Sequence, residues 1–184
     1  MILDRDQVTV LLCDIQLDIL PLLVDGAGLL HGCRWVADVS KEFGLPVLLT
    51  KHKKLGEFPP SLGKRADEMP VFEKDYFDLL SDSHAADHVL NDSRNQYVLA
   101  GAETHVVLLQ TALSLLSHGK EVFVLGDTCQ ARNAVDHTAG LKRLQSCGVQ
   151  ILTREMFFFE IIRRSEDPKY IKLARAYLDG RYLE

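Results

Sequence analysis

This sequence lacks most of the features that mark membrane, secreted and zinc-binding proteins. No apolar run approaches the length needed to span a bilayer, and no secretory signal precedes Val8. The four cysteines form neither a CxxC pair nor a zinc-finger pattern. These absences predict a protein with no membrane span in a reducing compartment inside the cell. The cytoplasm is the first expectation, and a mitochondrial association stays an open alternative.

Positive charge is also scarce. The chain has 21 Lys and Arg residues against 26 Asp and Glu residues, which gives a net charge of −5. Proteins that bind nucleic acids usually present the opposite balance. The short basic run 51–54 is typical of a solvated loop, although a local anion site is an alternative. Nucleic acid is therefore a disfavoured partner, but it stays open as one.

The 184 residues, 47% of them hydrophobic, suffice for one domain over residues 1–184. The chain shows no repeat, linker or low-complexity stretch, and strand and helix patterns alternate along it. The predicted strands are 8–13, 46–50, 71–72, 96–100, 121–125 and 149–152. The predicted helices are 28–43, 83–90, 104–117, 133–146, 154–163 and 167–178. A loop is expected from residue 51 to about residue 70.

The strand pattern predicts an α/β fold. Continuous apolar strands such as 8–13 are typical of strands that are buried on both faces. Repeated strand–helix–strand units favour a three-layer, Rossmann-like sandwich with a mainly parallel sheet of roughly six strands. Ligands bind such sheets beyond the carboxyl ends of the strands. Three segments fall there: Asp14, Lys74 and the turn 101–107.

Asp14 and Lys74 form the first candidate pair. A carboxylate that follows the apolar run 8–13 is costly to bury unless it is paired. If Lys74 reaches the same cleft, the two charges compensate, and Lys74 helps keep Asp14 ionised or positions a substrate oxygen. The alternatives are a loop or helix-capping aspartate and an ordinary surface lysine.

The turn from Gly101 to Val107 is the strongest local signal. Glycine permits a tight bend, Thr104 can N-cap the next helix, and the first amides of that helix would face the cleft. Such a position lowers the pKa of a thiol and stabilises an oxyanion. Here it holds Val106 and Val107, which cannot attack a substrate. An ordinary strand-to-helix turn is the alternative.

Taken in order, these motifs resemble the isochorismatase-like cysteine hydrolase superfamily, in its branch of small single-domain proteins. The resemblance spans nearly the whole chain. The motifs that carry it are Asp14-Ile-Gln16, Glu73-Lys74, Gly101-x-Glu-Thr-His-Val-Val107-x-x-Gln-Thr-Ala112, and Asp127-Thr-Cys129 with Arg132. The resemblance implies a triad of Asp14, Lys74 and a nucleophilic cysteine whose place is taken by Val107.

The resemblance also implies the surroundings of that triad. The peptide between Ala102 and Glu103 would match a cis bond of the family, and the amides of Glu103 and Val107 would match its oxyanion hole. Three more residues are candidates to line the pocket: Gln16, Thr104 and His105, with a capping role as the alternative for Thr104 and a partly exposed polar residue as the alternative for His105.

No other residue is expected to replace the missing cysteine. Cys13 should face away from Asp14 by strand alternation, Cys129 fits a buried core thiol, and Thr104 fits a cap. Some relatives bind a divalent metal after the second strand, but here a single histidine, His52, stands among lysines that oppose metal charge. We therefore predict no metal and no cofactor.

These residues leave three hypotheses for the function. In the first, a hydrolase-family protein keeps the Asp14–Lys74 pair and hydrolyses a small molecule without covalent catalysis, with Asp14 as general acid, or it has lost activity. True isochorismatases cleave a vinyl ether without a thiolate, so the resemblance permits the former. In the second, the chain is an inactive binding or assembly protein. The apolar segment 157–162 indicates a homo-oligomer, with core packing as the alternative. The third is a ribonuclease-like member.

Overall fold

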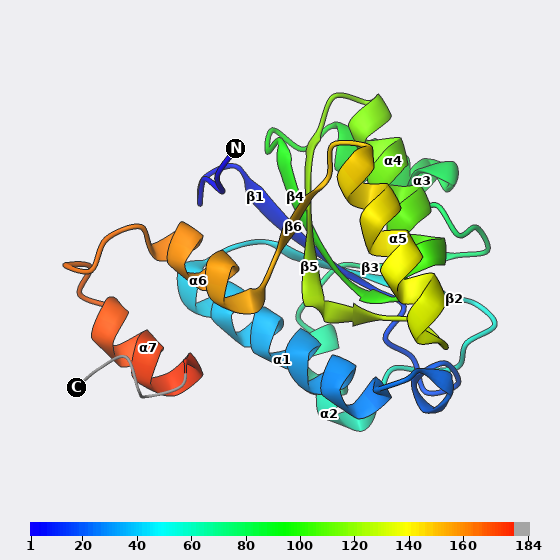
Figure 1. The fold of residues 1–184 in the computed structure, drawn as a ribbon, viewed down its shortest axis with the longest axis horizontal. Helices are drawn as coiled ribbons and strands as arrows, with labels where there is room; N and C mark the ends of the chain where they lie inside the picture. Colours follow the sequence, from blue (N-terminus) through cyan, green and yellow to red (C-terminus); the bar gives the residue numbers. More distant parts are fainter. Residues whose placement is uncertain (179–184) are drawn as a thin grey trace.

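The structure is a computed structural model that describes residues 1–178, with the backbone alone at residues 63 and 64. Its centre is a six-stranded, all-parallel sheet in the order β3-β2-β1-β4-β5-β6 (Figure 1). The strands are β1 Val8–Cys13, β2 Val47–His52, β3 Val71–Lys74, β4 Gln96–Ala102, β5 Glu121–Gln130 and β6 Gln150–Leu152. The prediction of a mainly parallel α/β sandwich is confirmed.

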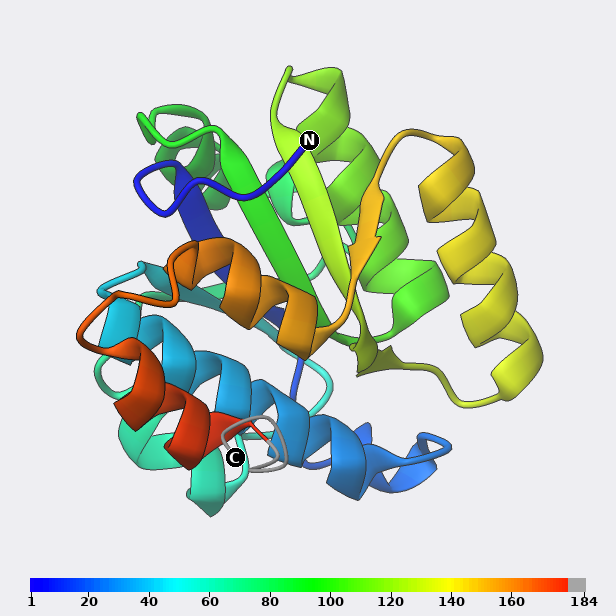
Figure 2. The same cartoon turned by 60° about the vertical axis from the view of Figure 1, so that its left-hand side comes forward.

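Helices cover both faces of this sheet. They are α1 Gly26–Phe43, α2 Pro60–Ala66, α3 Ser83–Leu90, α4 Leu109–Ser117, α5 Ala134–Ser146, α6 Arg154–Ile162 and α7 Tyr170–Tyr177. Figures 1 and 2 show α1, α2, α6 and α7 on one face and α3, α4 and α5 on the other. Short single turns add η1 Leu20–Leu22, η2 Leu79–Ser81 and the π-helical η3 Thr104–Leu108.

Strand β1 shows why the apolar strands are continuous. Val10 and Leu12 pack into the core under α1, whereas Leu11 and Cys13 pack into the core under α4. Because side chains alternate between the faces of a strand, burial on both faces requires apolar residues at successive positions. Cys13 is predicted to face away from Asp14, and its thiol accordingly packs into the core under α4.

The order of the strands positions the ligand site. The chain runs from β1 outward through β2 to β3, and it then returns to pair β4 with the other edge of β1. The connections leave β1 and β4 in opposite directions, which opens a crevice at their carboxyl ends. Asp14 follows β1 at this point, and the turn after Ala102 follows β4.

Several predicted boundaries are confirmed by caps. Gly44, at φ 70°, ends α1 in the left-handed conformation as predicted, but α1 begins at Gly26, two residues before its predicted start, with Asp25 accepting from the amide of Gly28. Thr153 accepts from the amide of Met156 and caps α6 as predicted.

Other boundaries were wrong. The predicted loop 51–70 contains α2, which begins at Pro60, a favourable first residue, and buries Leu62. The predicted start of the last helix at residue 167 is early by about one turn, because Asp167 accepts from the amide of Lys169 before α7 begins at Tyr170. The predicted capping role of Thr104 is also wrong, since its hydroxyl donates instead to the carbonyl of Gln130 (3.1 Å).

Within residues 1–178, every helix is too short or too polar to be a candidate membrane span.

Candidate functional site

A pocket of about 250 Å³ opens at the carboxyl ends of the strands. Its polar lining comes from Asp14, His52, Glu103 and Arg132, together with the turn at Ala102. Its walls are otherwise apolar: Ile19, Leu22, Leu55, Phe77, Val106 and Val107. The pocket therefore suits a small ligand with an apolar body and few polar groups.

Asp14 and Lys74 form a buried ion pair at this pocket. Lys74 Nζ lies 2.7 Å from Asp14 Oδ2, and both side chains are essentially inaccessible to solvent. The Thr50 hydroxyl donates to the other carboxylate oxygen, and the Asp14 amide donates back to the carbonyl and hydroxyl oxygens of Thr50, each at 3.2 Å. A buried carboxylate is tolerated because these partners replace its hydration. Of the arrangements that the sequence left open for Asp14 and Lys74, the structure has the ion pair.

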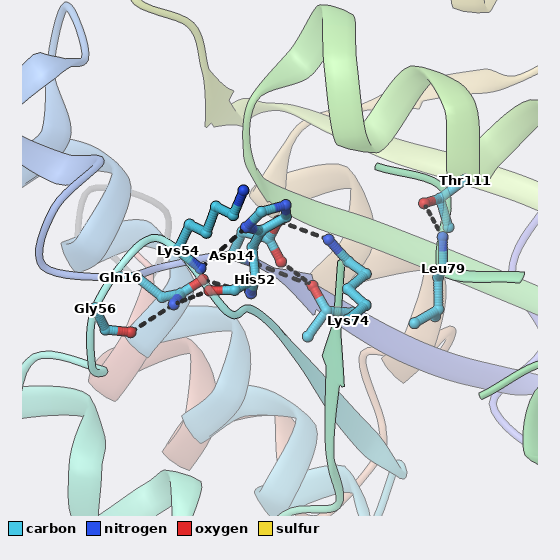
Figure 3. Close-up of polar contacts among 9 residues, drawn as sticks. Asp14, Gln16, His52, Lys54, Gly56, Lys74, Leu79 and Thr111 are labelled. Carbon is cyan, nitrogen blue, oxygen red and sulfur yellow. Dashed lines mark hydrogen bonds and ion pairs between the residues drawn. The ribbon is translucent and has the colours of Figure 1, made fainter. Parts of the chain in front are cut away.

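The end of β2 places His52 in the pocket wall beside this pair (Figure 3). Its backbone is held on both sides by Gln16, which accepts from the His52 amide (2.8 Å) and donates to the His52 carbonyl (2.9 Å). Gln16 also donates to the carbonyl of Gly56 at 2.6 Å. Gln16 thus joins the end of β2 to the following loop.

The ring of His52 is fixed as well. Its Nδ1 accepts from the backbone amide of Lys54 at 3.2 Å. The ring stacks on Phe77, with the ring centroids 5.8 Å apart and the planes inclined by 18°. The second ring nitrogen, Nε2, is left for other partners.

The turn after β4 requires a glycine at residue 101. Gly101 has φ 125°, and a Cβ atom there would lie 2.1 Å from the carbonyl oxygen of Cys13. The peptide bond between Ala102 and Glu103 is cis, as the resemblance implied. The Glu103 carbonyl then accepts from the amides of Val106 (3.1 Å) and Leu108 (3.2 Å), which flank Val107 in η3.

A second ion pair lies at the rim. The Glu103 carboxylate accepts from the backbone amide of Arg132 (3.1 Å) and from its Nε (3.0 Å). Glu103 is nearly buried, whereas the Arg132 side chain is about half exposed. This pair connects the turn after β4 to the segment after β5.

Comparisons with known proteins assign the chain to one family. A model of the Isochorismatase domain matches residues 8–156. The chain belongs to the isochorismatase family. The family relatives include Isochorismatase family protein 2B of Dictyostelium discoideum, 30% identical over 94% of this chain and 85% of the relative. Isochorismatase domain-containing protein 2 of Xenopus laevis is 26% identical over 91% and 82%.

Solved structures show the same isochorismatase-like fold. The MAR1 ribonuclease of Caenorhabditis elegans has a TM-score of 0.89 at 23% identity, over 98% of this chain and 94% of its own. YcaC of Escherichia coli, described as an octameric hydrolase of unknown specificity, has a TM-score of 0.84 at 23% identity, over 96% of each chain. At these identities the likeness concerns the fold alone.

The isochorismatase domain brings together only some of the predicted site residues. Four of them line the pocket: Asp14, Ala102, Glu103 and Val107. Lys74 forms the ion pair with Asp14. The remaining three, Gln16, Thr104 and His105, lie outside the lining.

Each of these three has other partners. The side chain of Gln16 is engaged by backbone groups of β2 and its loop. The Thr104 hydroxyl contacts His137 Nδ1 at 2.9 Å in addition to the Gln130 carbonyl. His105 turns toward α5, with Nε2 3.8 Å from a carboxylate oxygen of Asp136. The partners of these polar atoms therefore come from neighbouring elements.

Sequence reasoning missed two pocket residues of this isochorismatase domain. His52 ends β2 at the edge where ligands bind, so the topological rule could have identified it. Phe77 lies in the segment after β3, and no local pattern singles it out.

The two cysteines near the site are poor nucleophiles. Burial raises the pKa of the Cys13 thiol far above its ordinary range and raises that of Cys129 to about 12. Both thiols are therefore neutral at physiological pH, and both belong to the core beneath α4. The prediction of a core role for Cys129 is confirmed.

Proposed function

We propose that this member of the isochorismatase family binds a small molecule at the strand ends and hydrolyses it without a covalent intermediate. Asp14 acts as the general acid. The observation that carries the proposal is the buried Asp14–Lys74 pair, with Asp14 and Val107 in the walls of the same pocket.

The proposal includes no covalent catalysis, because residue 107 is a valine. The family resemblance places the nucleophilic cysteine there, and valine offers no lone pair. Neither Cys13 nor Cys129 can substitute, because burial keeps both thiols protonated.

The ion pair supplies the proton for a non-covalent route. Lys74 carries a transferable proton 2.7 Å from Asp14 Oδ2. With a vinyl ether, Asp14 delivers a proton to the terminal alkene carbon, and water adds to the resulting oxocarbenium carbon. The added water returns one proton to the pair, and the hemiketal separates into a carbonyl compound and an alcohol. General acid catalysis of this kind contributes about 10²–10⁴-fold.

The backbone amides of Glu103 and Val107 form the oxyanion site in this proposal. The π-turn around Val107 supports this assignment. Because backbone donors do not depend on the side chain at position 107, they persist without the cysteine.

The size of the pocket restricts the substrate. About 250 Å³ lies below the range of roughly 300–1,000 Å³ that holds drug-sized ligands. A small molecule therefore fits better than a segment of polymer.

The same pocket permits a second function, binding without turnover, which the inert valine at the centre of the site favours. A ribonuclease activity has less support, although one structural neighbour is the MAR1 ribonuclease of Caenorhabditis elegans. In the basic run, Lys51 lies 2.7 Å from Glu57, and Lys53 lies 2.6 Å from Asp75. These partners reduce the charge available to phosphates.

Assembly into a homo-oligomer accompanies the proposed function. Four of the apolar residues in segment 157–162 are buried in the core. Phe159, Met156 and Ile2 remain partly exposed around one surface hollow and supply an apolar contact. The YcaC neighbour from Escherichia coli is described as octameric. A monomer in light scattering at micromolar concentration would contradict this part.

The test compares the wild-type protein with three variants on small uncharged vinyl ethers, esters and amides. Asp14→Asn should abolish vinyl ether hydrolysis, while Asp67→Asn, at an exposed aspartate, should leave it unchanged. Val107→Cys should gain amide or ester hydrolysis if the ion pair and the backbone donors are intact.

Three outcomes separate the hypotheses. Unchanged vinyl ether turnover in Asp14→Asn contradicts the general-acid role. Binding without turnover in the wild type, with gained amidase activity in Val107→Cys, supports the binding function instead. RNA cleavage that depends on salt and on Asp14 would restore the ribonuclease alternative.

A further inference from the structure

The polar groups of the pocket specify its ligand more narrowly than the proposed function, on which this inference rests. We infer that the pocket selects an uncharged small molecule with an oxygen acceptor, and that His52 Nε2–H is the donor that recognises this oxygen. The argument combines the charge balance of the lining with the fixed orientation of one ring.

The charged groups at the pocket are already paired. Asp14 is matched by Lys74 at 2.7 Å, and Glu103 is matched by Arg132 at 3.0 Å. The formal charges of these four side chains therefore cancel. An anionic ligand would lose its hydration and find no unpaired cation among these four side chains, and burial of such a charge is strongly unfavourable.

His52 provides the donor. Its Nδ1 accepts from the Lys54 amide, so the neutral ring carries its proton on Nε2. The ring lies in the pocket wall, and stacking on Phe77 limits its rotation. The two backbone bonds from Gln16 fix its base. A donor held in this way loses little entropy when it binds an acceptor.

The rest of the lining agrees with this assignment. The other side chains of the lining are apolar, including Leu55, Val106 and Val107. One directed hydrogen bond within an apolar enclosure fixes the orientation of a ligand and discriminates against analogues that lack the acceptor.

The experiment uses three aromatic probes that differ in one ring substituent: benzamide, benzoate and toluene. Binding is measured by titration calorimetry, and the methyl resonances of Val107 report whether the probe occupies the pocket. We expect the wild-type protein to bind benzamide about tenfold more tightly than either benzoate or toluene.

Two variants at one position separate recognition from structure. His52→Gln places an amide donor near the position of Nε2 but loses the Nδ1 contact, whereas His52→Asn keeps an acceptor for the Lys54 amide but lacks the donor. We expect His52→Gln to retain the preference for benzamide and His52→Asn to lose it. His84→Asn, at a histidine on α3 outside the lining, is the matched control and should bind like the wild type.

The outcomes also distinguish this inference from the proposed function. Equal or tighter binding of benzoate, or an unchanged preference in His52→Asn, would overturn the inference but leave a small-molecule site. Failure of all three probes to shift the Val107 resonances would contradict both.

Discussion

Replacement of Lys74 by methionine tests how strongly the buried ion pair stabilises the fold. Methionine has a similar length, so the main change is the loss of the ammonium group. The Asp14 carboxylate would keep its Thr50 hydrogen bonds and stay buried without a counter-charge. Removing one partner of a buried pair destabilises proteins by about 3–5 kcal/mol. For a chain of this size, the melting temperature should fall by roughly 6–20 °C.

The assay is urea unfolding followed by circular dichroism, with Lys74→Met, Asp14→Asn and the double variant. Because the double variant lacks both charges of this pair, it should recover most of the stability that Lys74→Met loses. Lys41→Met is the control, since Lys41 and Glu68 form an exposed pair and its loss should leave the midpoint unchanged. A Lys74→Met variant within about 1 kcal/mol of the wild type would refute the reasoning.

Three further predictions concern the core and the turn. Native protein should react with a thiol reagent at the exposed Cys147 alone among its four cysteines, and unfolded protein at all four; native labelling of Cys129 would contradict its burial. Stability should fall as the pH rises from about 8.5, because the unfolded chain then loses thiol protons that the native state retains. The free energy of unfolding should fall by about 1.4 kcal/mol per pH unit for each buried thiol, until Cys129 ionises near pH 12. A urea midpoint that stays the same between pH 8 and 10 would contradict this prediction. Gly101→Ala should destabilise by more than about 3 kcal/mol, because the new methyl group meets backbone, whereas Gly119→Ala has free space and should lose only about 1 kcal/mol; equal midpoints for both variants would refute this explanation.

The strands and the ion pair could be predicted from the sequence because their signals are local. A continuous apolar run such as β1 requires burial on both faces, and a carboxylate directly after it requires a partner. The parallel topology then brings the ends of β1 and β3 to one edge of the sheet, with β2 between them. Asp14 and Lys74 meet there for that reason.

The hydrogen-bond partners of Thr104 and Gln16 could not be predicted, for one physical reason. The hydroxyl of Thr104 can cap its own helix or bond to another strand. It donates to the carbonyl of Gln130 because β5 extends five residues beyond its predicted end. Gln16 likewise bonds to the end of β2 and to Gly56, both distant in sequence. A local pattern does not encode which distant backbone atom lies within reach.

The central position of β1 has a consequence for synthesis of the chain. Its Val8–Cys13 backbone pairs on one side with β2, but its other partner, β4, begins only at Gln96. At roughly 5–20 residues per second, translation leaves that edge unpaired for on the order of 5–20 s. An apolar strand with a free edge is a template for association with other chains. The nascent protein is therefore most vulnerable to aggregation, and most in need of a chaperone, before its fourth strand emerges.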